Sequence, residues 1–138
     1  MKSRFLQVIP VLLPLLVIVI TPLSYQCIYQ SGSCYGTWIS HVYPYFINPL
    51  YDFSFYFLPI AIILIFVSRD VFKSWLKFAA WALPLAFILV ALTPVTSHGF
   101  MDFFPFYRDD AARLAGEVVS VLSIILIAWK WSSLRHRA

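Results

Sequence analysis

The chain has 138 residues, which leaves room for one domain. Hydrophobic residues make up 62% of it and charged residues only 12%, whereas a soluble domain is about 45–50% apolar and about 25% charged. A water-soluble fold of this length cannot hide so much apolar surface, so we expect lipid to cover the remainder. The net charge of +4 does not indicate nucleic-acid binding, because the basic residues stand at the ends of apolar segments and form no stripe.

The first apolar stretch, residues 5–23, follows the basic sequence Met1-Lys2-Ser3-Arg4 and resembles a secretory signal peptide in outline. However, the residues after it, Thr21 to Gln26, contain no pair of small residues that would form a cleavage site. The stretch is therefore predicted to be a retained helix.

Three further apolar stretches cover residues 50–68, 72–93 and 111–131. Each is close to the ~20 residues that a helix needs to cross a bilayer, and none alternates as the strands of a membrane barrel do. The sequence predicts an all-α integral membrane protein, a single transmembrane domain over residues 1–138 with four transmembrane helices. The fourth span is the weakest, since Arg113 and Glu117 lie in its opening turns, and partial insertion is the alternative.

The distribution of Lys and Arg predicts the orientation, because cytoplasmic loops carry the excess of basic residues. With the N-terminus inside, only Arg108 and Arg113 fall on the outer side. The other basic residues fall on the cytoplasmic side: Lys2, Arg4, Arg69, Lys73, Lys77, Lys130, Arg135 and Arg137. We therefore expect a cell-membrane protein with both termini in the cytoplasm.

Two outer loops, about residues 25–49 and 94–110, are rich in aromatic residues. Such rings settle at the lipid–water boundary, so both loops are expected to lie across the outer face. The first also contains Cys27 and Cys34 around Ser31-Gly32-Ser33, which can turn the chain back. A structural disulfide is predicted, since this compartment permits one; two free buried thiols or a redox-active pair are the alternatives.

Four helices with outward-facing cysteines resemble, in outline, the quinone-linked membrane thiol oxidases that reoxidise disulfide-forming enzymes. Those proteins use a Cys-x-x-Cys pair and a second cysteine pair. Here six residues separate Cys27 from Cys34, and the second outer loop has no cysteine. The resemblance is limited to the number of helices and the side of the membrane that the cysteines face, and it implies a functional role for no residue of this chain.

Charged residues gather where the fourth span begins. Asp109 or Asp110 suits the capping of that helix, and Arg113 and Glu117, four apart, are placed to form an ion pair. Because a carboxylate two turns into a span is costly, Glu117 is also a candidate for proton or cation passage or for headgroup binding. His98 and Asp102 lack the supporting cluster that a metal site needs, and no cofactor motif is present, so neither metal nor cofactor is expected.

A stripe of small residues on the fourth span predicts close helix packing. Its members are Ala112, Gly116, Ser120 and Ser123. The packing partner is another helix of the chain, a second copy or a different protein. The other spans are bulkier, which makes close packing within the chain harder.

The stretch from Phe66 to Trp81, with Leu92-Thr93-Pro94 and Phe103-Phe104-Pro105-Phe106, resembles small bacterial four-helix membrane proteins without an assigned function. The resemblance implies the four-helix topology and no activity. The expected role is a non-catalytic assembly or accessory subunit, partnered by lipid and by a second copy or another membrane protein. A small transporter, or a membrane thiol-disulfide oxidoreductase, is the alternative.

Overall fold

The computed structural model describes residues 2–94 and 107–135, all of whose regular elements are helical. In chain order these are α1 (Lys2–Tyr25), the π-helical turn η1 (Gln26–Gln30), α2 (Trp38–Val42), the π-helical turn η2 (Tyr43–Ile47), α3 (Asn48–Phe66), α4 (Arg69–Leu92) and α5 (Arg108–Arg135). The predicted all-α class is confirmed. Four helical stretches, of 24, 29, 24 and 26 residues, are long and apolar enough to cross a membrane.

The four long helices match the predicted spans to within a few residues at each end. The first is longer than predicted, because α1 runs through Pro22 and ends at Tyr25. Pro59 and Pro84 likewise lie inside α3 and α4. Proline removes a backbone donor, yet it is tolerated in apolar helices whose neighbours satisfy the freed carbonyls.

The connection between α1 and α3 differs most from its prediction as an outer loop over residues 25–49. Its two sides continue the helices: η1 prolongs α1, while α2 and η2 lead without a break into α3. Pro44 and Pro49 stand at the first turns of η2 and α3, where a missing amide costs little. The non-helical part is residues 31–37.

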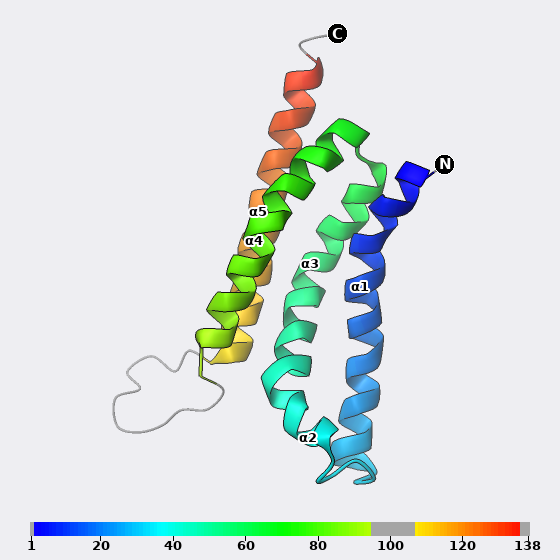
Figure 1. Ribbon diagram of the computed structural model, residues 1–138, viewed down its shortest axis with the longest axis vertical. Coiled ribbons are helices and arrows are strands. Elements are labelled where there is room, and N and C mark those ends of the chain that lie inside the picture. The colour runs from blue at the N-terminus through cyan, green and yellow to red at the C-terminus, as the bar shows by residue number, and fades with distance from the viewer. Residues whose placement is uncertain (1, 95–106, 136–138) are drawn as a thin grey trace.

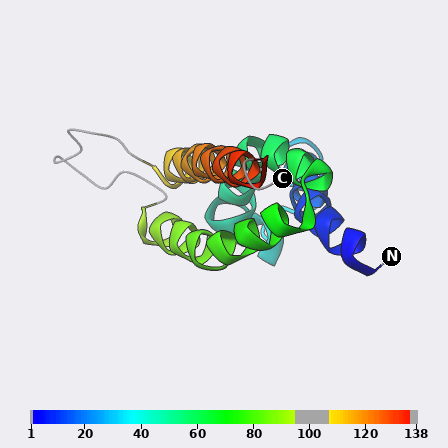
Figure 2. The same cartoon turned by 90° about the horizontal axis from the view of Figure 1, so that it is seen from above.

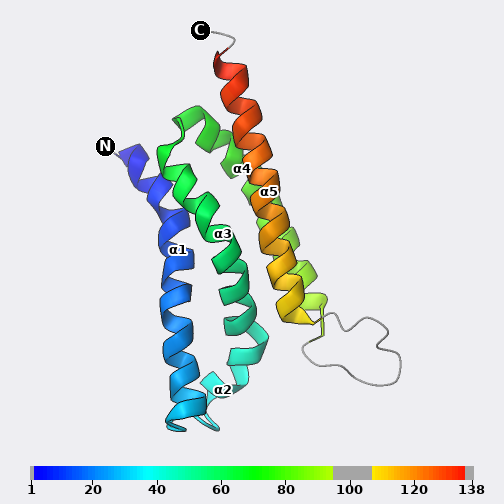
Figure 3. The ribbon, with the colours of Figure 1, turned by 180° about the vertical axis from the view of Figure 1, so that it is seen from behind.

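The long helices form an open array. The most extensive packing joins α3 to α5, α1 to α3 and α4 to α5. Seen along the helices, α4 and α5 lie side by side, with α1 on the far side of α3 (Figure 2). The start of α1, the end of α5 and the turn between α3 and α4 share one end of the array (Figure 1). Figure 3 shows α1 and α3 side by side from the opposite direction.

A buried core lies among α3, α4 and α5. Ile60, Leu64 and Val71 are almost fully enclosed, and the Trp75 ring stacks on Phe57, with ring centres 6.2 Å apart. The opposite surfaces of these helices expose many large aliphatic and aromatic side chains. Apolar residues therefore both fill the core and cover the outside.

Candidate functional site

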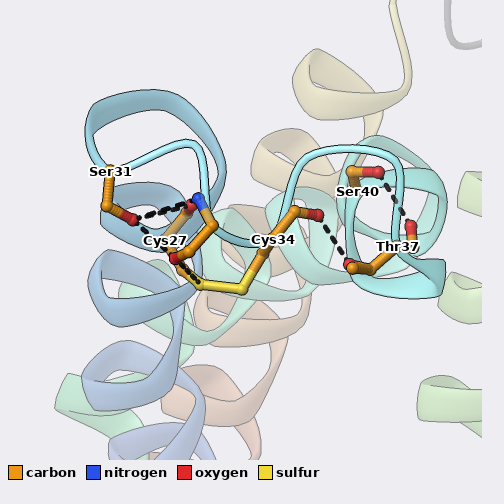
Figure 4. Close-up of a disulfide and its surroundings, with 6 residues drawn as sticks. Cys27, Ser31, Cys34, Thr37 and Ser40 are labelled. Atoms are coloured by element: carbon orange, nitrogen blue, oxygen red, sulfur yellow. Dashed lines mark hydrogen bonds between the residues drawn. A yellow bond between two sulfur atoms is a disulfide. The ribbon is translucent and has the colours of Figure 1, made fainter.

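Cys27 and Cys34 are joined by a disulfide whose Cα atoms lie 5.3 Å apart (Figure 4). Gly32 and Gly36 adopt φ angles of 66° and 77°, values that favour glycine and let the short connection turn. The Ser31 hydroxyl donates to the Cys27 carbonyl oxygen over 3.0 Å. The bridge thus closes a compact turn between η1 and α2, and both cysteines of the chain are used in it.

The two aspartates at the start of α5 have different partners. Asp110 accepts a hydrogen bond from the Tyr107 backbone N–H over 3.3 Å, as the third helical residue of a capping box does. Neither aspartate occupies the N-cap position itself, because α5 begins at Arg108. Asp109 accepts instead from the Asn48 side-chain amide over 2.8 Å. Asp109 therefore connects α5 to the start of α3.

Arg113 and Glu117 form the predicted pairing, with Nε and Oε1 3.1 Å apart. The Arg113 guanidinium also lies over the Tyr56 ring, 5.1 Å from its centre. Both charged side chains are exposed, at 60% and 46% of their accessible surface. The pair lies on the outside of the array, within the stretch of α5 that is apolar enough to cross a membrane.

Polar residues recur every fourth position on both α3 and α5, so each set lies on one face of its helix. The Asn48 amide donates to Asp109, and the Arg113 guanidinium lies over the Tyr56 ring. Asp52 lies between Asn48 and Tyr56 on the same face of α3. The two rows therefore face each other along the seam between two parallel helices. We call this set the polar ladder: Asn48, Asp52 and Tyr56 from α3, and Asp109, Arg113 and Glu117 from α5. It extends for about two helical turns, roughly 12 Å at 1.5 Å per residue.

The small-residue stripe of α5 packs inside the chain. A Cβ atom on Gly116 would lie 3.0 Å from the carbonyl oxygen of Phe53, so α3 and α5 are in close backbone contact there. One turn on, the Ser120 hydroxyl donates to the Tyr56 carbonyl oxygen over 2.9 Å. Ala112 is almost fully buried. The bulk of the other spans did not prevent this packing, because the small residues of α5 contact the backbone of α3.

Ser123 continues the stripe toward the other end of α5. Its hydroxyl, with no exposed surface, accepts a hydrogen bond from the Trp75 indole N–H over 3.0 Å. The stripe therefore contacts α3 at Gly116 and Ser120, and α4 at Ser123.

The α3 half of the ladder was not identified from the sequence. The spacing of four between Asn48, Asp52 and Tyr56 can be read from the sequence. Whether these residues lie opposite the polar residues of α5 depends on how α3 and α5 are aligned, which the spacing does not determine.

His98 and Asp102 lie outside the described residues. Within residues 2–94 and 107–135, no three His, Cys, Asp or Glu side chains are grouped as a metal site would require.

The chain has no significant match among protein-family models, curated proteins or solved structures.

Proposed function

We propose that the chain is a multi-pass protein of the cell membrane, with four spans and both ends in the cytoplasm. Its four apolar helices are long enough to cross a membrane, and large apolar side chains cover their outer surfaces. The end of the array that carries both termini also carries most of the Lys and Arg residues, as expected for a cytoplasmic side.

Within that membrane we propose a non-catalytic assembly or accessory subunit. The observation that supports this role is the exposure of the Arg113–Glu117 pair on the outside of an apolar helix. Ionisable groups within a membrane face a protein interior or a water-filled cavity, because lipid cannot solvate them. A neighbouring membrane protein that covers the polar ladder would supply this environment.

The composition of the ladder indicates the chemistry of that neighbour. Asp52, Asp109 and Glu117 outnumber the one cation, Arg113. A partner helix with a Lys, an Arg or several amide donors at this depth would be complementary to them. Two copies meeting at this face would bring acidic groups together, so a different protein is the better fit. Gly116 and Ser120 already pack against α3, so the interface rests on polar groups.

A small transporter is the second candidate, and the same ladder favours it. Its carboxylates begin at one end of the array and continue inward for about two turns, which is the arrangement that an entry path for protons or cations needs. The thiol-oxidoreductase alternative has less support, since the disulfide uses both cysteines and leaves no second pair to exchange with.

Purification from the native membrane in a mild detergent, followed by native mass spectrometry, tests the assembly role. The decisive variant combines Arg113→Glu with Glu117→Arg, which keeps an ion pair within α5 but reverses the charges shown to a partner. We expect the wild-type chain and Leu114→Ala, an exposed neighbour, to retain a second polypeptide that the double variant loses. Retention by the double variant would refute recognition through the ladder. A chain that carries no polypeptide, but moves protons into liposomes in a Glu117-dependent way, would favour the transporter.

A further inference from the structure

Arg108, the first residue of α5, holds together the outer ends of three elements. Its Nε donates to the Thr93 carbonyl oxygen over 2.9 Å, and its Nη2 to that of Ala91 over 3.0 Å. Its Nη1 donates to the Tyr45 carbonyl oxygen over 3.3 Å, with the guanidinium 5.7 Å from the Tyr45 ring centre. The cation thus satisfies carbonyls that the end of α4 leaves without helical partners.

These bonds leave part of the guanidinium unused. The group has five N–H donors, and the three bonds to carbonyl oxygens occupy one donor on each nitrogen. Carbonyl oxygens carry no negative charge, and within the described part of the chain no carboxylate forms an ion pair with Arg108. One further hydrogen on each terminal nitrogen remains to meet an anion.

An apolar pocket of about 240 Å³ lies beside this cation. Its walls come from η2, α3, α4 and α5, and among the residues that the structure describes Arg108 is the one charged residue that lines it. Leu50, Phe53 and Phe87 also line a larger groove of about 520 Å³, whose walls are α1 and α4 and whose floor is α3. Pocket and groove are therefore adjacent and share part of their apolar lining, and Arg108 lies at the pocket.

We propose that the pocket binds one phospholipid with an anionic headgroup. A phosphate oxygen accepts the free donors of Arg108, in a charge-assisted pair, while one acyl chain occupies the pocket and the other lies in the adjacent groove between α1 and α4. The inference rests on the proposed membrane location and does not involve the partner at the polar ladder. A helix, about 10 Å across, is too wide for the pocket, and a lipid without net negative charge would add nothing to balance the charge of Arg108.

Native mass spectrometry of the full chain in an uncharged detergent can test the proposal, with phosphatidylglycerol and phosphatidylcholine of identical acyl chains as probes. We expect retention of phosphatidylglycerol to exceed that of phosphatidylcholine by about tenfold, because the choline cation of phosphatidylcholine balances the phosphate charge that would otherwise pair with Arg108. Arg108→Gln should abolish the preference, whereas Arg113→Gln, which removes a cation elsewhere on α5, should preserve it. Equal retention of the two lipids, or an unchanged preference in Arg108→Gln, would overturn the proposal.

A second pair of variants covers the case in which Arg108→Gln does not fold. Ala91 is exposed and lines the pocket, so Ala91→Phe fills the pocket and leaves the Ala91 carbonyl in place. We expect it to reduce phosphatidylglycerol retention severalfold, while Ala128→Phe, at an exposed site away from the pocket, retains the lipid. Equal retention by both Phe variants would refute binding in this pocket.

Two competitors identify the source of the anion. Preferential displacement of phosphatidylglycerol by oleate would assign the pocket to a free fatty acid. Displacement by glycerol phosphate alone would show that no acyl chain is bound. Either result contradicts a phospholipid site. The assay uses the isolated chain, so it is separable from the proposed function. Absence of the chain from the membrane fraction would refute both, whereas a membrane-bound chain without lipid preference would refute the lipid site alone.

Discussion

Replacing Gly116 with alanine perturbs the closest backbone approach between α3 and α5. The new Cβ would lie 3.0 Å from the Phe53 carbonyl oxygen and 3.2 Å from the Tyr56 Cβ. A flexible side chain can move away from such a contact, but a carbonyl inside a helix moves only with the helix. We therefore expect α3 and α5 to separate slightly along this seam.

Two opposing terms set the magnitude of the effect. Overpacking a well-packed site costs about 1–3 kcal/mol, while Gly→Ala in a helix interior contributes about 1 kcal/mol of stabilisation. The net result should be a loss of stability on the order of 1 kcal/mol. Gly116→Leu should lose more, since a branched side chain cannot fit against backbone atoms.

The hydrogen bond one turn away provides a sharper test. Ser120 donates to the Tyr56 carbonyl oxygen, and such bonds in membrane proteins contribute about 0.6 kcal/mol on average. If Gly116→Ala separates the helices, it weakens this bond as well, so Ser120→Ala should cost less in the Gly116→Ala background than in the wild type. The two substitutions would then be non-additive.

Reversible unfolding of the full chain in mixed detergent micelles measures these differences. Ala128→Gly, at an exposed position of the same helix, gives the helix-propensity term by itself, and should cost about 1 kcal/mol. A Gly116→Ala variant that is more stable than the wild type, with an additive Ser120→Ala effect, would refute the close approach.

The other predictions use simple readouts. Replacing Cys27 and Cys34 with serine should lower the free energy of unfolding by about 2 kcal/mol, because the disulfide closes a short loop; a reductant should produce the same shift in the wild type and none in the variant. Ser123→Ala should cost about 1 kcal/mol or more in the same assay, since it leaves the buried Trp75 N–H without its acceptor; unchanged stability would contradict that hydrogen bond. A reporter that is active only outside the cytoplasm should be silent at either end of the chain, and activity at one end would show the orientation to be wrong.

The helical spans were predictable because length and apolarity alone determine which segments can cross a bilayer. The residues at which the helices end were less predictable. Pro44 and Pro49 lay in the predicted loop, yet both are accommodated within a helical stretch, and α1 continues past its predicted end to Tyr25. The disulfide was predictable from local features, two nearby cysteines around a Ser-Gly-Ser turn.

The polar ladder was only half predictable, and the reason is geometric. Arg113 and Glu117 are neighbours on one helix, so their spacing is sufficient to predict the pair. Their relation to Asp52 and Tyr56 depends on how far α5 slides along α3, which no pattern within one helix determines. Gly116 sets the closeness of that contact, and the Asn48–Asp109 bond joins the two helices at their outer ends.

Polar contacts account for which helices touch and which do not. In lipid, apolar side chains give little reason for two helices to associate, so close packing and hydrogen bonds between helices determine the arrangement. Each of the three extensive contacts has such a bond. Gln7 of α1 donates to the Val67 carbonyl at the end of α3. Ser120 of α5 donates to the Tyr56 carbonyl of α3, and Trp75 of α4 donates to Ser123 of α5. Among the described residues, α1 and α4 share no hydrogen bond, and between them lies the apolar groove. The groove is therefore a consequence of where the polar residues stand, and filling it with an acyl chain requires no bond between helices to break.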